Sequence, residues 1–151
     1  MFPPVLELVP HRGPALLVSH VLSHSDRETS CGAAIHEAHP YLKDGRVDAV
    51  IALELMAQTI AARGGLAAHD PDTVLQPQTG YVLGAPSLEF LDGDFHLNDQ
   101  LEITVRLVQQ LGAMAQYEGE VRVSGSLRAR GTLSVYVGAA QTNSRPKEAQ
   151  P

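Results

Sequence analysis

Cysteine, basic residues and long apolar runs are scarce in this sequence, and each shortage excludes a class of protein. The one cysteine, Cys31, cannot form a disulfide within the chain; we interpret it as a small buried hydrophobic residue, which fits a reducing cytoplasm. No apolar run is long enough to cross a bilayer. With 11 basic against 17 acidic residues, the chain lacks the positive surface that nucleic acids require. We therefore expect a cytoplasmic protein that binds neither nucleic acid nor membrane.

The length and the two ends of the chain predict its domain organisation. A chain of 151 residues, 44% of them hydrophobic, is sized for one domain with a single core. The opening Met1-Phe2-Pro3-Pro4 has neither the basic segment nor the apolar core of a secretory signal. We expect one domain over residues 1–139 and a disordered polar tail over residues 140–151.

The stretch 48–65 predicts the helix around which the other elements are arranged. Asp48 suits an N-cap, the interior is rich in Ala, Leu and Met, and Gly64-Gly65 favours a helix end, so we expect a helix over residues 48–63. Apolar side chains point in nearly every direction around this helix, which is typical of a helix wrapped by other structure.

Two polar residues, Glu54 and Gln58, interrupt that apolar coat on one face of the helix. A carboxylate there is costly to bury unless it is paired, hydrogen-bonded or protonated. Either this face reaches solvent, or the helix carries a catalytic acid whose carboxyl group Gln58 orients.

The remaining sequence predicts mainly strands. Leu6 to Val9 is a short apolar start, and residues 37–46 are expected to be an irregular loop. Alternating apolar and polar residues predict strands over 16–24, 29–36, 80–90 (bent at Gly84-Ala85-Pro86), 101–107, 116–123 and 127–137. Ser124-Gly125 predicts a hairpin turn, and Arg128 and Arg130 are expected to face outward on the last strand. One apolar helix among antiparallel strands indicates an α+β layout with a sheet curled round the helix.

Several short motifs follow one another in a recognisable order. The N-terminal segment fits P-H-R-x-P-x-L-L (Pro10 to Leu17), and the helix fits E-x-M-A-Q (Glu54 to Gln58). Tyr81-Val82-Leu83-Gly84 with Phe90, and Asp99-Gln100-Leu101, continue the series. From about residue 8 to 137 the chain thus resembles the hot-dog fold family, and within it the 3-hydroxyacyl-[acyl carrier protein] dehydratases. The resemblance implies a hot-dog domain and a homodimer or higher homo-oligomer.

The sequence departs from that family in the loop before the helix. The family has G-H-F-P-G-x-P-x-x-P-G there, whereas this chain has Ala38-His39-Pro40-Tyr41-Leu42 and reaches the helix through Asp48-Ala49, with the loop one residue longer. The chain is therefore most similar to a divergent branch of dehydratase-like proteins from aryl polyene and polyketide-like pathways.

The resemblance implies a reaction and its residues. Removing water from a 3-hydroxyacyl thioester needs a base for the C2 proton and an acid for the hydroxyl. His39 and Glu54 are the family's catalytic pair, which face each other across a dimer interface, and they need a neutral His and a protonated Glu. The N–H groups of Ala49 and Val50 at the helix start would stabilise the thioester oxygen, with Asp48 as a competitor for them. No cofactor or metal is implied.

Further residues are assigned to substrate binding. The resemblance places Leu83, Gly84 and Phe90 along the acyl tunnel. Because acyl carrier proteins are acidic, docking needs a local basic patch, for which Lys43, Arg46 and Arg63 are the candidates. They could equally be scattered surface charges.

The other histidines have simpler interpretations. His36, Glu37 and His39 do not form a metal-binding pattern and lack a third ligand. His11 is expected to fix the turn before the first strand through hydrogen bonds rather than to act in catalysis. The remaining histidines are expected to be ordinary: His20, His24, His69 and His96.

Three functions stay open on the sequence. The first is an acyl-carrier-protein dehydratase that forms the trans-2-enoyl thioester. The second is a hot-dog thioesterase in which Glu54 activates water. The third is an acyl-binding subunit that has lost its catalytic pair.

Overall fold

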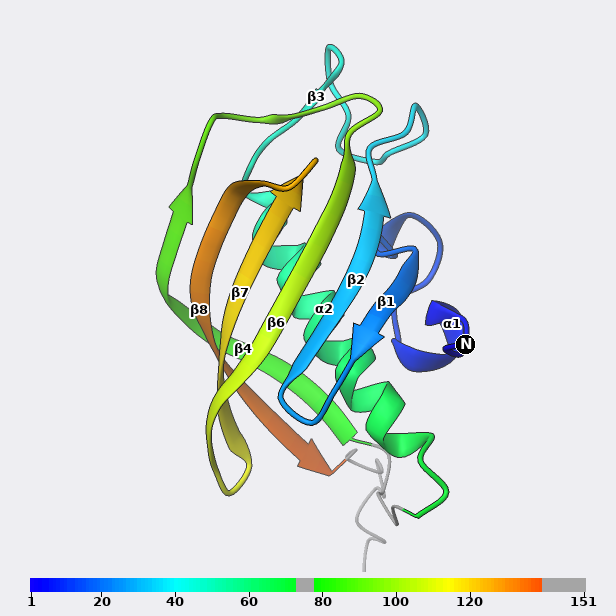
Figure 1. The fold of residues 1–151 in the computed structure, drawn as a ribbon, viewed down its shortest axis with the longest axis vertical. Helices are drawn as coiled ribbons and strands as arrows, with labels where there is room; N and C mark the ends of the chain where they lie inside the picture. The colour runs from blue at the N-terminus through cyan, green and yellow to red at the C-terminus, as the bar shows by residue number, and fades with distance from the viewer. Residues whose placement is uncertain (73–77, 140–151) are drawn as a thin grey trace, which may run out of the picture.

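The computed structural model describes residues 1–72 and 78–139, so the tail expected at 140–151 lies outside the described residues (Figure 1). The described residues include the α-helices α1 (Val5–Leu8) and α2 (Ile51–Ala68) and a 3₁₀ turn, η1 (Gly13–Ala15). The strands are β1 (His20–His24), β2 (Glu28–Ala34), β3 (Arg46–Val47), β4 (Gln78–Phe90), β5 (Phe95–His96), β6 (Gln100–Leu111), β7 (Met114–Val123) and β8 (Ser126–Ala139).

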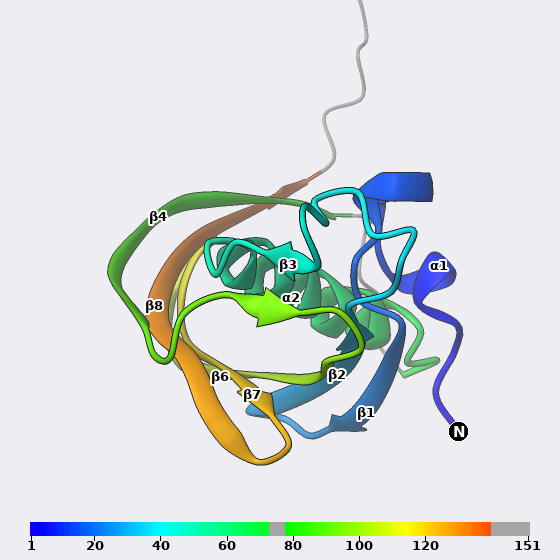
Figure 2. The same cartoon turned by 90° about the horizontal axis from the view of Figure 1, so that it is seen from above.

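Six strands form one antiparallel sheet that curves around α2. Their order in the sheet is β1-β2-β6-β7-β8-β4, and Figure 2 shows the sheet wrapped around the helix. A second, two-stranded sheet joins β3 to β5 near the start of α2. The predicted α+β layout is confirmed. β3 and β5 are not apparent from the sequence because two-residue strands carry no periodicity.

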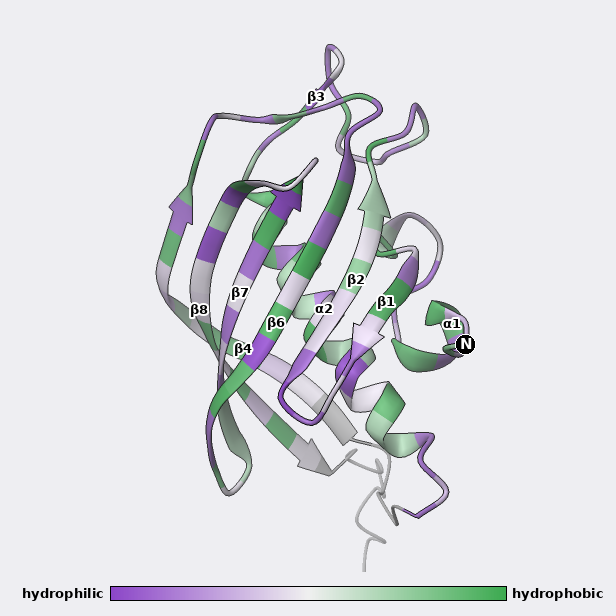
Figure 3. Cartoon of the chain, viewed as in Figure 1, coloured by the Kyte–Doolittle hydropathy of each residue, from purple (hydrophilic) through white to green (hydrophobic). Residues whose placement is uncertain are grey.

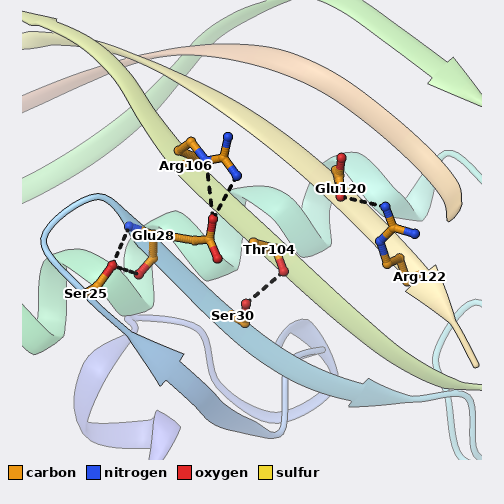
Figure 4. A network of polar contacts seen from close by, with 7 residues as sticks. All are labelled: Ser25, Glu28, Ser30, Thr104, Arg106, Glu120 and Arg122. Carbon is orange, nitrogen blue, oxygen red and sulfur yellow. Dashed lines mark hydrogen bonds and ion pairs between the residues drawn. The ribbon is translucent and has the colours of Figure 1, made fainter. Parts of the chain in front are cut away.

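The sheet is apolar toward the helix and polar on its other face. Along β6, Leu101, Ile103 and Val105 are buried and alternate with polar residues, which Figure 3 shows as alternating colours. On the outer face (Figure 4), two polar pairs join β2 to β6, Arg106 with Glu28 at 3.1 Å and Ser30 with Thr104 at 2.8 Å, and Arg122 pairs with Glu120 along β7 at 3.2 Å. The apolar face of the sheet therefore packs against α2, which lies in the core.

Several local predictions are confirmed. The register of β4 against β8 shifts on either side of Gly84, where the bend was predicted. Ser124 and Gly125 both have positive φ, as a tight hairpin turn requires. Cys31 is fully buried, and burial raises the pKa of its thiol to about 11.

The helix bounds differ from the prediction at both ends. The α-helix begins at Ile51 because residues 48–50 form a tighter 3₁₀-type turn, in which Ile51 N–H donates to the Asp48 carbonyl. At the other end, α2 continues through Gly64-Gly65 to Ala68. Gly65 is needed for packing rather than for ending the helix, because a Cβ there would lie 2.6 Å from Leu8 Cα in α1.

The prediction that Arg128 faces outward is also wrong, because its side chain is buried. The register of β7 against β8 shifts between Val121 and Arg122, so strict alternation fails beside Arg128. Its guanidinium donates to the carbonyls of Leu91, Asp92 and Asp94 and lies 5.3 Å from the centre of the Phe95 ring. Arg128 therefore organises the loop between β4 and β5.

The two glycines of α2 make a matched pair for stability measurements. Gly64→Ala should stabilise the protein by up to about 1 kcal/mol, since nothing lies within 4 Å of the added Cβ and alanine favours a helix. Gly65→Ala should destabilise it by roughly 1–3 kcal/mol through overpacking against Leu8. Urea unfolding of both variants tests this, and equal stabilisation would contradict the close approach of α1 to α2.

Candidate active site

Glu54 lies in the first turn of α2 and faces a cleft of about 490 Å³. Its side chain is 46% exposed in the single chain. One copy of the chain therefore leaves Glu54 on a helix face that reaches solvent, the first of the two alternatives that the sequence left open. The cleft has mainly apolar walls and two carboxyl groups at its edge, formed by Ala15, Leu17, Tyr41, Val47, Asp48, Val50, Ile51, Leu53 and Glu54. Its size and lining suit a small apolar group such as part of an acyl chain.

The amide of Gln58 connects the N-terminal segment, α2 and Glu54. Gln58 is fully buried, and its Oε1 accepts hydrogen bonds from the N–H groups of Leu17 (2.9 Å) and Val18 (3.2 Å). Its Nε2 donates to the Ala15 carbonyl (2.7 Å) and to Glu54 Oε1 (3.0 Å). All four hydrogen-bonding positions of the amide are thus used, so the orientation of the amide is fixed.

His11, which we expected only to fix a turn, lies beside Glu54 in the site. Its Nε2 lies 3.4 Å from Glu54 Oε1, and its side chain is 28% exposed. Its Nδ1 is buried without a hydrogen-bond partner in the part of the chain that the structure describes. The expected turn-fixing role is wrong, because Arg12 holds this turn by donating to the Val9 and His11 carbonyls, both at 2.7 Å. The P-H-R motif was the only sequence signal for His11.

His39 is the better-buried histidine, only 6% exposed. Its Nδ1 accepts a hydrogen bond from the Tyr41 N–H at 3.2 Å, so a neutral ring carries its proton on Nε2. Burial lowers the pKa of His39, and the neighbouring His36 lowers it further. The ring therefore stays neutral at pH 7, as a catalytic role in proton transfer needs. Tyr41, whose N–H selects this tautomer, also lines the cleft.

The N–H groups at the start of α2 are already engaged by carboxylates. Val50 N–H donates to Asp48 Oδ1 at 2.9 Å, and Ala49 N–H donates to Asp94 Oδ1 at 3.3 Å. The sequence indicated Asp48 as a competitor but not Asp94, which lies far along the chain. Asp94 belongs to the loop held by Arg128, so this β8 arginine supports the helix start through that loop.

The remaining candidates are distributed over the molecule. Lys43 and Arg46 flank the turn Asp44-Gly45 and form an antiparallel bridge, which brings both side chains to one hairpin near the start of α2. Arg63 lies about 18 Å further along the helix, at 1.5 Å per residue. Its guanidinium donates to Ser25 O at 2.8 Å, to Thr29 Oγ1 at 3.1 Å and to Asp26 O, so it binds the β1–β2 turn.

The three residues predicted to line an acyl tunnel are on β4. Leu83 and Phe90 are exposed, and neither they nor Gly84 lines the cleft beside Glu54 within one chain. In the described residues no cluster of three or more His, Cys, Asp or Glu side chains could hold a metal ion, and no described helix could span a membrane.

The protonation of His39 can be measured directly. In a histidine-ring titration by NMR, His39 should be neutral with its proton on Nε2 at pH 7 and should bind a second proton only below pH 6.5. His36→Gln should raise the His39 pKa toward 6.5, because it removes a nearby positive charge. A His39 pKa above 6.5, or a proton on Nδ1, would contradict the burial and the Tyr41 hydrogen bond.

Comparisons with known proteins agree with this fold. A family model described as ApeP-like, ApeP dehydratase, matches residues 3–145. The 3-hydroxyacyl-[acyl-carrier-protein] dehydratase FabZ of Streptococcus thermophilus is 28% identical over 140 residues, covering 89% of this chain and 95% of the relative. FabZ of Streptococcus mutans is 28% identical over 142 residues with the same coverage.

Solved structures resemble the chain over most of its length. The dehydratase heterocomplex ApeI:P from Xenorhabdus doucetiae superposes with a TM-score of 0.84 at 25% identity, covering 93% of this chain and 94% of that one. A hypothetical thioesterase of Streptococcus pneumoniae with coenzyme A, at 14% identity and a TM-score of 0.61, shares the fold alone. The fold is confirmed as a hot dog. The chain belongs to the ApeP-like family of dehydratases, hydro-lyases that resemble the 3-hydroxyacyl-[acyl carrier protein] dehydratases and act on 3-hydroxyacyl thioesters.

Proposed function

We propose that this dehydratase acts on 3-hydroxyacyl groups carried by an acyl carrier protein and forms the trans-2-enoyl thioester through His39 and Glu54. The observation that carries the proposal is the carboxyl of Glu54, oriented by the buried Gln58 amide and facing an apolar cleft. An orienting hydrogen bond to a carboxyl at an acyl-sized cleft suits proton transfer to or from a bound thioester.

The reaction needs two proton transfers. One group removes the proton from C2, and the other gives a proton to the C3 hydroxyl, which leaves as water while the C2–C3 double bond forms. With a neutral His39 as base, Glu54 is the acid. His39 Nε2 can accept the C2 proton only after its own proton has moved to Nδ1, so the bond from Tyr41 N–H must be released when substrate binds.

The thioester oxygen needs hydrogen-bond donors as it gains negative charge. We assign this role to the N–H groups of Ala49 and Val50 at the start of α2. The Ala49 N–H is the more weakly held of the two, because its hydrogen bond to Asp94 is longer (3.3 Å) than the one from Val50 to Asp48 (2.9 Å). Substrate binding then requires one carboxylate to give up its N–H partner.

Two copies of the chain are needed to complete this site. β4 is the last strand of the sheet, and among the described residues its second edge has no partner strand. It exposes Tyr81, Val82, Leu83 and Phe90, and a long apolar edge strand is a surface for pairing. We propose a homodimer joined along β4, in which His39 of one copy approaches Glu54 of the other and Leu83, Gly84 and Phe90 line the acyl tunnel. The ApeI:P relative was solved as a heterocomplex, so a different partner chain is the alternative.

The acid–base pair is tested by removing its transferable protons. Glu54→Gln keeps the shape and the hydrogen bond with Gln58 but should lower dehydration at least about 100-fold, within the range typical of general acids and bases. His39→Ala and His39→Gln should cost as much, and the double variant little more, because the two residues act as a unit. The measurement is enoyl-thioester formation from a 3-hydroxyacyl carrier protein.

The controls separate mechanism, assembly and reaction type. Co-expressing Glu54→Gln with His39→Ala should restore part of the activity, since a mixed dimer has one intact site. Full activity in Glu54→Gln would refute the mechanism, and a wild-type chain that is monomeric by light scattering at micromolar concentration would refute the homodimer. Free thiol in place of the enoyl product would indicate a thioesterase, and neither product would indicate an acyl-binding subunit.

The carrier is proposed to dock on the hairpin that bears Lys43 and Arg46. Reversing both charges (Lys43→Glu with Arg46→Glu) should raise KM for a carrier-bound substrate at low salt, with little effect on a short pantetheine thioester. Arg63→Gln is the comparison, because its guanidinium is bound to the β1–β2 turn and its loss should reduce stability more than docking. Unchanged carrier kinetics in the double reversal would exclude this patch.

A further inference from the structure

The two oxygens of the Glu54 carboxyl are in different environments. Oε1 receives the Gln58 amide N–H at 3.0 Å and also lies 3.4 Å from His11 Nε2. Among the described residues, Oε2 has no hydrogen-bond partner. The carboxyl borders the cleft, so the oxygen without a partner is the one that remains for a bound substrate.

We propose that His11 is a positioning residue for catalysis, which together with Gln58 holds Glu54 by Oε1 and reserves Oε2 for proton exchange with the substrate. The inference rests on the proposed role of Glu54. It adds a second histidine to the site, one supplied by the same chain as Glu54.

The burial of His11 selects its hydrogen-bonding form. Its Nδ1 is sealed from solvent and has no partner in the described part of the chain. A buried N–H without an acceptor is rarer than a buried lone pair without a donor. A neutral ring therefore has no hydrogen on Nδ1 and carries it on Nε2, which lies 3.4 Å from Glu54 Oε1.

Hydrogen bonds on both sides of His11 hold the backbone that carries it. Arg12 donates to the carbonyls on either side of Pro10, at Val9 and His11. Just beyond it, Ala15, Leu17 and Val18 are bonded to the same Gln58 amide that contacts Glu54. Hydrogen bonds of the Gln58 amide thus connect the segment that carries His11 to the carboxyl of Glu54.

Two amide substitutions at position 11 distinguish the contribution of each ring nitrogen. In His11→Gln the amide nitrogen can reach the place of Nε2, whereas in His11→Asn it can reach only the place of Nδ1. His11→Ala removes both. Dehydration kinetics are measured for all three, with wild type and Glu54→Gln in parallel and with thermal unfolding and light scattering to verify folding and assembly.

We expect His11→Ala and His11→Asn to lower kcat about 10- to 100-fold, since a small misplacement of a catalytic group costs up to about 100-fold. KM should change less than about threefold, because His11 does not contact the substrate. His11→Gln should recover most of the lost kcat. In the Glu54→Gln background, His11→Ala should cost less than about threefold more, since its action runs through Glu54.

Other outcomes overturn the inference. Wild-type kcat in His11→Ala would show that the contact between His11 and Glu54 does not contribute to catalysis. A loss confined to KM would make His11 a substrate-binding residue. Equal loss in His11→Gln and His11→Ala, with both proteins folded, would mean that the imidazole itself exchanges protons. The proposed function fails separately, through retained activity in Glu54→Gln, so the two failures are distinguishable.

Discussion

The buried amide of Gln58 is the interaction on which the geometry of the site depends. A polar group in a dry interior is costly unless every donor and acceptor is matched, about 1–3 kcal/mol for each unmatched group. Here two backbone N–H groups, one backbone carbonyl and one carboxyl oxygen match it completely. The price of misplacing this amide is therefore high, and the N-terminal segment and α2 are held in one relative position. The hydrogen bond from Gln58 then orients the Glu54 carboxyl group.

The segment that leads into α2 is held by a different set of contacts. Arg128 buries a positive charge with backbone carbonyls around it, and these carbonyls belong to the loop that leads into β5. Because that loop also places Asp94 against the Ala49 N–H, two residues before α2 begins, a side chain on β8 influences the charge at the start of the helix. Two buried polar side chains, Gln58 and Arg128, thus hold the N-terminal segment and the start of α2 in place.

The sequence predicts most of the fold and part of the site. The strands follow from the alternation of apolar and polar residues, and the central helix follows from Asp48 and an interior rich in Ala, Leu and Met. The pairing of Glu54 with Gln58 follows from their spacing on one helix face. The continuation of α2 past Gly64-Gly65 cannot be predicted from the sequence, because Gly65 is required by a contact with Leu8, which is far away in the chain. The burial of Arg128 depends on a strand bulge, and the approach of His11 to Glu54 depends on how a proline-rich turn packs. Such tertiary contacts leave no local pattern.

The close packing of Leu8 on Gly65 constrains the length of the N-terminal segment between Leu8 and Leu17. The N-terminal segment is fastened to α2 at two levels, by the Leu8–Gly65 contact toward the end of the helix and by the Gln58 amide nearer its start. His11 lies on the span between these attachments, so its reach to Glu54 is set by how many residues the span contains. Because both ends of this segment are attached to α2, its length is fixed. Substitutions within it are tolerated more easily than an insertion or deletion, which would shift the His11 imidazole along the helix.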